Sequence, residues 1–192
     1  MQPKLLPTVF IAIGVASSSS MAAEAYKIDT KHADLIFSVE HAGFTHKRGW
    51  FRDFEGLLQF DATKPENSKV DVTVKTDSLD TALPARDQDL KSGMFLDSAK
   101  YPEMHFESTK VVAAENQSLR IEGNLTLHGV TKPITLNAKL NKAGPNPFDK
   151  TPTLGFSATG ELKRSEFGIA TFIPMIGDLV EITIEAEFRR EP

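Results

Sequence analysis

Apolar residues occupy every second position from Val180 to Phe188, and glutamate or threonine fills the positions between them. Successive side chains of a β-strand point to opposite faces, so this period of two predicts a strand with one dry and one wet face. Seven earlier segments alternate in the same way. The eight expected strands are Leu35–His41, Phe54–Phe60, Val70–Thr76, Met104–Ser108, Leu119–Leu127, Ile134–Leu140, Leu154–Leu162 and Val180–Phe188.

The connections between these segments are mostly short and rich in turn-forming residues, as at 64–67, 115–117, 128–130 and 144–147. Short connections favour antiparallel pairing of neighbours, and eight strands with one dry face can close into a barrel that holds one ligand. A two-sheet sandwich with a filled core is the alternative. The barrel is favoured because the chain meanders without an obvious long crossover. We therefore expect an all-β, eight-stranded antiparallel barrel.

One long insertion, residues 78–102, separates the third and fourth expected strands. Pro84 suits the first position of a helix, and a short helix is expected from Pro84 to about Leu96. Leu90 and Met94 would then form an apolar stripe over the barrel mouth, although Gly93 weakens the helix. A second apolar insertion follows at 171–177.

The first 23 residues have the pattern of a secretory signal peptide: Lys4, an apolar run at 9–16, and small residues up to Ala23. Cleavage is expected after Ala22 or Ala23, which leaves residues 24–192 as one exported domain. A frayed N-terminal helix is the alternative interpretation. The apolar run is too short to span a bilayer.

Composition excludes several classes of function. The chain has no cysteine, which rules out thiol catalysis, thiolate zinc sites and c-type haem attachment. Its net charge is −4 and no basic cluster is evident, so a nucleic acid partner is not expected. There are 13 Phe against 2 Tyr and 1 Trp, and phenylalanine without a polar tip builds dry surfaces.

Catalytic and metal-binding patterns are also missing from the sequence. The five histidines at 32, 41, 46, 105 and 128 include no pair at the spacing that places two ligands on one face of a strand or helix. No nucleophile, metalloprotease or nucleotide-binding motif occurs. We expect no catalytic residues, no metal and no cofactor; a zinc site assembled from distant histidines is the alternative.

A dry barrel face makes an elongated apolar pocket the expected site. Its candidate residues are Phe37, Val39, His41, Phe54, Leu58, Met94, Phe95, Phe106, Phe156 and Ile182. Several of them could instead pack a closed end of the barrel. His41 is in phase with the dry face and could donate to a lipid head group, and Arg48 and Arg86 are further head-group candidates.

Nine ordered motifs carry a resemblance to a known family. They are YKID (26–29), FSVEHAG (37–43), RGWFRDFEG (48–56), SLDT (78–81), RD (86–87), FLD (95–97), YP (101–102), FEST (106–109) and LTLHGVTKP (125–133). In this order, from Tyr26 to about Phe188, the chain resembles the YceI-like periplasmic proteins. The resemblance implies a lipocalin-like barrel, a hydrophobic tunnel for polyisoprenoid chains such as quinones and prenyl lipids, and a periplasmic location.

The sequence departs from that family at one position. The family often has Arg-Asp-x-His-Leu in the helical insertion, and Asp89 occupies the histidine position here. An acidic residue disfavours an anionic head group, so a neutral head such as a quinone or prenylphenol is favoured over a pyrophosphate.

The leading hypothesis is a non-enzymatic periplasmic carrier that sequesters an isoprenoid or quinone-like lipid, with transient contact to the membrane or a membrane protein. The first alternative is an enzyme that acts on such a lipid through His41 or Asp87. The second is a stress-related structural protein whose barrel is solid. The size of the interior cavity distinguishes the solid barrel from the other two.

Overall fold

The computed structural model describes residues 23–191 of the chain. The strands are β1 (Glu24–His41), β2 (Thr45–Phe51), β3 (Phe54–Phe60), β4 (Lys69–Lys75), β5 (Leu79–Asp80), β6 (Glu103–Ala113), β7 (Ser118–Leu127), β8 (Val130–Pro145), β9 (Pro152–Lys163) and β10 (Ile176–Arg190). The helices are α1 (Pro84–Lys91) and the short 3₁₀ helices η1 (Pro65–Asn67), η2 (Thr76–Ser78) and η3 (Arg164–Phe167). The expected signal peptide lies outside the described residues and stays a prediction.

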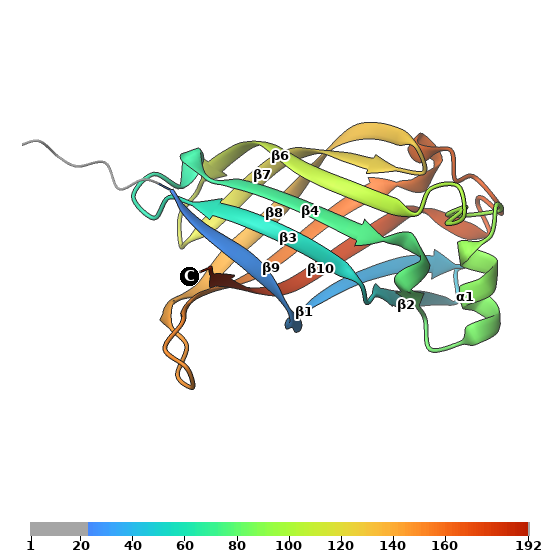
Figure 1. The fold of residues 1–192 in the computed structure, drawn as a ribbon. Helices are drawn as coiled ribbons and strands as arrows, with labels where there is room; N and C mark the ends of the chain where they lie inside the picture. Colours follow the sequence, from blue (N-terminus) through green and yellow to red (C-terminus); the bar gives the residue numbers. More distant parts are fainter. Residues whose placement is uncertain (1–22, 192) are drawn as a thin grey trace, which may run out of the picture.

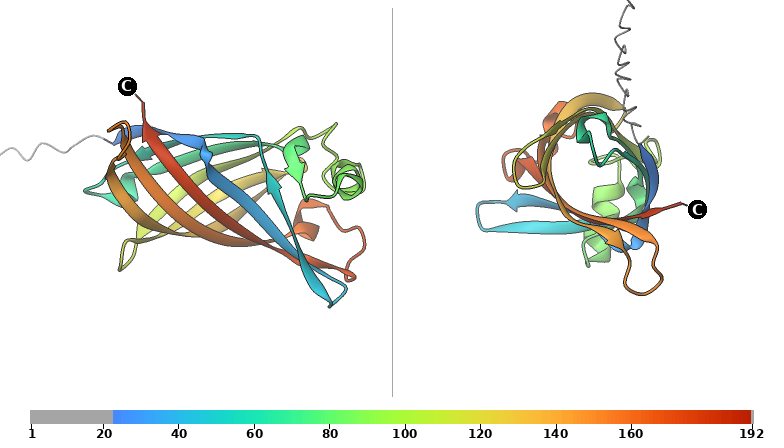
Figure 2. Two further views of the ribbon diagram at one scale, coloured as in Figure 1. Left: turned by 90° about the horizontal axis from the view of Figure 1, so that it is seen from below. Right: turned by 90° about the vertical axis from the view of Figure 1, so that its left-hand side faces the viewer.

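All ten strands belong to one antiparallel sheet, in the order β10-β9-β8-β7-β6-β4-β3-β1-β2-β5. An additional pairing of β10 with β1 closes the sheet, so that β1, β3, β4 and β6 to β10 form an eight-stranded barrel. Figure 1 shows the barrel from the side, and the right-hand view of Figure 2 looks along its axis. The predicted closed barrel is confirmed, and closure pairs both neighbours of each of the eight barrel strands.

The first strand is much longer than its alternation predicts. It begins at Glu24, pairs with β3 over its first four residues, and pairs with β2 from Leu35 to His41. Between Ile28 and Ala33 its register against β10 shifts, which marks a bulge where the strand bends. The β1–β2 hairpin therefore extends beyond the barrel wall, as Figure 2 shows.

The apolar residues that alternate along the sequence are buried in the structure. In β3, Phe54, Gly56, Leu58 and Phe60 are buried, and the residues between them are exposed. The buried side points into the barrel, and the buried aliphatic and aromatic residues form two neighbouring clusters along its length. The predicted inward face of this strand is therefore correct.

The two ends of the barrel are built differently. At the end opposite α1, the rings of Phe60, Phe156 and Phe188 pack edge to face, with centroid distances of 6.1 Å for each neighbouring pair. At the other end lie α1, the 92–97 turn and the 168–175 loop (Figure 1). One end is thus filled by aromatic packing, and irregular segments cover the other.

The helical insertion is shorter than predicted. Helix α1 ends at Lys91, where Ser92 caps it, so Met94 lies in the following turn and not on the helix. Leu90 still points toward the interior. Glycine at position 93 and serine at 92 both disfavour another helical turn, which accounts for the difference. Among residues 23–191, no helix is both long enough and apolar enough to cross a membrane.

Candidate functional site: an apolar barrel cavity

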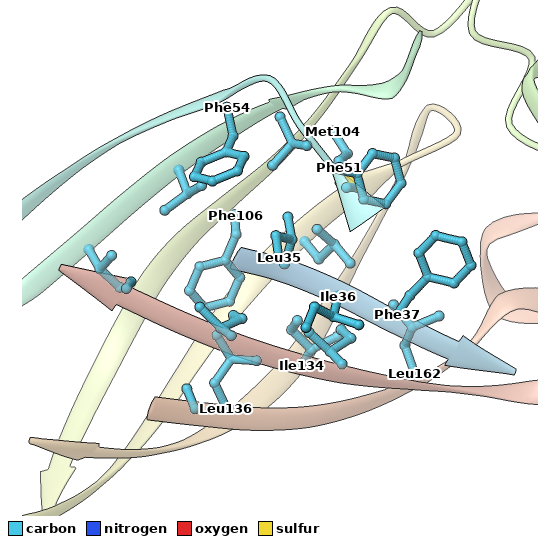
Figure 3. Close-up of a pocket in the computed structure, with 18 of the residues that line it drawn as sticks. Leu35, Ile36, Phe37, Phe51, Phe54, Met104, Phe106, Ile134, Leu136 and Leu162 are labelled. Atoms are coloured by element: carbon cyan, nitrogen blue, oxygen red, sulfur yellow. The ribbon is translucent and has the colours of Figure 1, made fainter. Parts of the chain in front are cut away.

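The barrel encloses an elongated cavity of about 290 Å³. Among the described residues, 41 line it, and 37 of these are aliphatic, aromatic or methionine side chains. The polar members are Asp34, Ser68, Lys69 and Arg164. Figure 3 shows Leu35, Phe106 and Leu136, from three different strands, around the common interior space. Such a wall offers dispersion contacts and almost no hydrogen bonds to a ligand.

The cavity follows the barrel axis. On β7 its wall runs from Leu119 to Leu127, which at the usual rise per residue is about 26 Å along the strand. The wall includes Val111 and Ala138 toward the aromatic end, and Phe95 and Ile169 toward the α1 end. Its shape therefore suits a long, narrow, flexible molecule.

Eight of the ten predicted pocket residues lie on this wall. They are Phe37, Val39, Phe54, Leu58, Phe95, Phe106, Phe156 and Ile182. Seven of them belong to strands and were chosen because a period of two assigns their side chains to the inward face. Their position on the wall is a structural result, whereas their contact with a ligand remains a prediction.

His41 and Met94 do not line the cavity, in contrast to the sequence-based expectation. His41 has the correct phase, but β1 extends beyond the barrel there, and the side chain is exposed next to the hairpin turn. Met94 is 49% exposed because the chain leaves the helix before it, while its neighbour Phe95 turns inward. The alternation of apolar and polar residues along a strand does not reveal where the strand extends past the rim of the barrel.

Neither predicted head-group arginine contributes to the wall. Arg48 pairs with Ser38, on the outward face of β1 and β2, opposite to the face that carries Phe37. Arg86 binds Thr81: its Nε donates to Oγ1 at 2.8 Å and its Nη2 donates to the main-chain oxygen at 2.8 Å. This pair ties α1 to the chain just after β5.

Arg164 is a buried cation in the cavity wall that was not predicted from the sequence. Its guanidinium donates to three main-chain carbonyls: Nε to Gly177 (2.8 Å), Nη1 to Ile169 (3.0 Å) and Nη2 to Ile176 (2.8 Å). Burial lowers the pKa of Arg164, because the charged form loses water. The side chain fastens both ends of the 169–177 segment to η3, which is a structural role. No signal of this is present in the sequence, because the acceptors are main-chain carbonyls of the irregular loop that follows η3 and carry no side-chain pattern.

Other wall residues were within reach of the sequence pattern. Ile121, Leu125, Ile134, Leu136 and Leu162 belong to segments already recognised by their alternation. Val72 and Ile184 follow the same rule. The ten predicted pocket residues did not include them, although every inward position along a barrel strand can reach the cavity.

One group of potential metal ligands occurs in residues 23–191. Asp29, His32 and Glu187 have ligand atoms within 4.8 Å of one another. The Asp29 carboxylate already bonds the His32 ring at 2.9 Å and lies 3.7 Å from the Arg189 guanidinium. Those contacts hold the pKa of Asp29 below its usual value against the opposing effect of burial, which is the largest single influence. A neighbouring guanidinium disfavours a bound cation, so we assign no metal to this group.

A closed eight-stranded antiparallel barrel with an apolar interior defines a lipocalin-like binding barrel as the architectural class. The sequence model of the YceI-like domain matches residues 26–188, and the chain belongs to this family. Protein YceI of Salmonella agona (strain SL483) is 41% identical over 189 residues, which cover 97% of each chain. The predicted family and fold are thereby confirmed.

Two solved structures have the same fold. BcnA of Burkholderia cenocepacia superposes with a TM-score of 0.76 at 20% identity, covering 83% of this chain and 98% of that one. A polyisoprenoid binding domain from Saccharophagus degradans, implicated in plant cell wall breakdown, superposes with a TM-score of 0.64 at 14% identity, covering 88% and 99%. At these identities the similarity establishes the architecture.

Proposed function

We propose that this protein binds one long isoprenoid lipid inside the barrel and carries it through the periplasm without chemical change. The observation that carries the proposal is the wall of the cavity, where 37 of 41 residues are apolar. The presence of the cavity favours binding over the alternative of a solid structural barrel. The isoprenoid-binding relative of the same fold supports the choice of lipid class.

The physical need for such a carrier follows from the chemistry of the lipid. Each buried CH₂ group contributes about 0.8 kcal/mol, so a forty-carbon prenyl chain gains roughly 30 kcal/mol on leaving water. The binding free energies of non-covalent complexes saturate at about −20 kcal/mol, so this transfer free energy is not itself an affinity. A lipid of this kind does not cross an aqueous compartment unaided, and a dry tunnel provides the transport environment.

The polar head of the lipid is expected to remain outside the tunnel. The wall offers almost no polar atoms, and the guanidinium of Arg164 already serves three carbonyls. A buried polar head without partners would cost several kcal/mol. Asp89 on α1 is exposed and adds negative charge near that end of the barrel, which favours a neutral quinone or phenol head over a pyrophosphate.

A matched pair of variants on β3 tests binding inside the barrel. Leu58 lines the cavity and is 7% exposed, whereas the adjacent Leu57 points outward and is 53% exposed. We expect Leu58→Asp to abolish co-purifying lipid and Leu57→Asp to retain it, because only the first places a carboxylate against the chain. Organic extracts of purified protein, read by mass spectrometry, give the lipid-to-protein ratio, and circular dichroism verifies the fold of each variant. Equal lipid content in the two folded variants contradicts the proposal.

Export has its own test. Intact-mass measurement of the protein from its native host should show loss of the first 22 or 23 residues, with the material in the periplasmic fraction. A mass that retains Met1, or recovery from the cytoplasm, disproves the proposed location without affecting lipid binding.

A further inference from the structure

The exposed apolar side chains are concentrated at the α1 end of the barrel. In the described part of the chain, nine large apolar side chains are exposed. Six of them lie on segments at this end: Phe44, Leu83, Met94, Phe172, Met175 and Leu179. We define four of these as the apolar rim: Phe44 (87% exposed), Met94 (49%), Phe172 (50%) and Met175 (61%). Water contact at these positions is unfavourable, and exposed apolar side chains gathered at one end of a molecule indicate an interaction surface.

Hydrogen bonds join the three segments that carry the rim. The main-chain N–H of Ala42, in the β1–β2 turn, donates to the carbonyl of Met175 at 2.7 Å. The Thr171 hydroxyl donates to the carbonyl of Met94 at 2.6 Å. The hairpin turn, the 168–175 loop and the turn after α1 are therefore held as one surface.

The rim is continuous with the cavity. Met94 is exposed and the next residue, Phe95, lies on the cavity wall; Met175 is exposed and the next residue, Ile176, also lies on the wall. The ring of Phe172 lies 6.3 Å from that of Phe95, centroid to centroid. An apolar path thus leads from the outer surface into the tunnel.

The hairpin adds positive charge around its aromatic tip. From His41 to Arg48 it contains two histidines, Lys47 and Arg48, and no carboxylate; Glu40 immediately precedes it. Phe44 is exposed in the turn between β1 and β2, and the basic residues Lys47 and Arg48 follow it on β2. An exposed aromatic residue followed by two cations matches the interface of an anionic bilayer, where rings enter the acyl boundary and cations meet phosphates. The negative charge of Asp89 belongs to α1 and not to this hairpin.

We propose that the apolar rim docks on a bilayer containing anionic phospholipid, with Phe44, Phe172 and Met175 inserted at the interface, so that lipid passes between membrane and tunnel without entering water. This inference rests on the proposed lipid-binding function for its purpose, but vesicle binding can be measured independently of tunnel occupancy. Transfer along a dry path avoids exposing the acyl chain.

Flotation with lipid vesicles tests the docking. Wild-type protein should float with vesicles of phosphatidylglycerol and phosphatidylethanolamine, and less with pure phosphatidylcholine. The double variant Phe44→Ser, Met175→Ser should lower the partition coefficient by tenfold or more, since each buried side chain contributes roughly that factor. Phe148→Ser is the matched control, because Phe148 is 93% exposed in the turn between β8 and β9, at the opposite end. An equal loss for the control, or no flotation of the wild type, overturns the proposal.

A fluorescence measurement that retains every rim residue provides a second test. The chain has no cysteine, so Thr45→Cys can carry a single environment-sensitive dye beside Phe44. Addition of the anionic vesicles should shift its emission to the blue, whereas the same dye at Pro147→Cys, beside Phe148, should not respond. Normal lipid content together with an unresponsive Thr45→Cys dye means that docking is wrong and tunnel binding stands. A blue shift with a lipid-free tunnel supports docking and contradicts the carrier proposal.

Discussion

At the scale of single residues, the interior is shaped by aromatic rings that rest against glycine. A Cβ atom added to Gly123 would lie 2.4 Å from the Phe106 ring, and one added to Gly49 would lie 2.4 Å from the Phe37 ring. Both distances are far inside van der Waals contact. The two glycines therefore let large rings lie flat along the wall, and this leaves the barrel axis open for a ligand.

Phe106 distinguishes a ligand-lined wall from a filled core. Truncation of a phenylalanine ring to alanine in a filled core lowers the free energy of unfolding by about 3–5 kcal/mol. Phe106→Ala should cost less in the lipid-free protein, because its ring already faces the cavity, while the lipid-to-protein ratio falls. Phe167→Ala is the control, since Phe167 is 1% exposed and does not line the cavity, and it should show the full cost. Urea unfolding of stripped protein gives both free energies. If Phe106→Ala is as costly as Phe167→Ala and lipid content is unchanged, Phe106 is a core residue.

At the scale of elements, one carboxylate organises the turn between β3 and β4. Oδ1 of Asp61 accepts hydrogen bonds from the Thr63 hydroxyl (2.7 Å) and the Lys64 amide (2.9 Å), and Oδ2 accepts one from the Asn67 side chain (3.1 Å). These bonds favour the ionised form and lower the pKa of Asp61 to about 2. The turn is thereby stabilised through a charge that acid can remove.

The pH dependence follows from that shift. The pKa of Asp61 is lower in the folded chain than the usual value of about 3.9 in an unfolded one. Its contribution is complete above pH 4 and disappears as the pH falls toward about 2. Asp61→Asn should therefore destabilise the protein at pH 7 and show a smaller further loss between pH 4 and pH 2 than the wild type. Urea midpoints across this range measure the effect. Glu66→Gln, an exposed carboxylate in the same turn, should retain the wild-type profile.

The loop that carries part of the apolar rim depends on Arg164. Removal of its guanidinium leaves the carbonyls of Ile169, Ile176 and Gly177 without their donor, and each unsatisfied buried group costs about 1–3 kcal/mol. Arg164→Met should lower stability by several kcal/mol and raise amide hydrogen exchange in the 169–177 segment. Arg120→Met removes an exposed arginine of β7 and should change neither quantity measurably. Unchanged exchange in Arg164→Met would show that other contacts hold this loop.

At the scale of the whole molecule, closure of the sheet creates a cavity that a ligand can fill. A ligand that binds only the folded state stabilises it, by about 2.7 kcal/mol when present at a hundred times its dissociation constant. Stripping the lipid should therefore lower the thermal midpoint by several degrees, since about 1 kcal/mol shifts a chain of this size by roughly 2–4 °C. Return of the extracted lipid should restore the midpoint, and calorimetry measures both changes. An unchanged midpoint after verified removal of lipid contradicts binding in the folded barrel.

The amino-acid sequence alone predicted eight of the ten strands and most of the side chains that point inward along them, because alternation is a local property that each strand expresses independently; β2 and β5 were not predicted. It also determined the family, through motifs such as RGWFRDFEG at 48–56 and LTLHGVTKP at 125–133. Only the tertiary structure decided the pairing of β10 with β1 and the bend of β1 between Ile28 and Ala33. The extension of β1 past the barrel places His41 beyond the rim, and the folding of the 169–177 loop brings three carbonyls to Arg164. The pairing of β1 with β10 joins residues far apart in the chain, and the Arg164 contacts depend on the path of an irregular loop; the alternation of apolar and polar residues encodes neither.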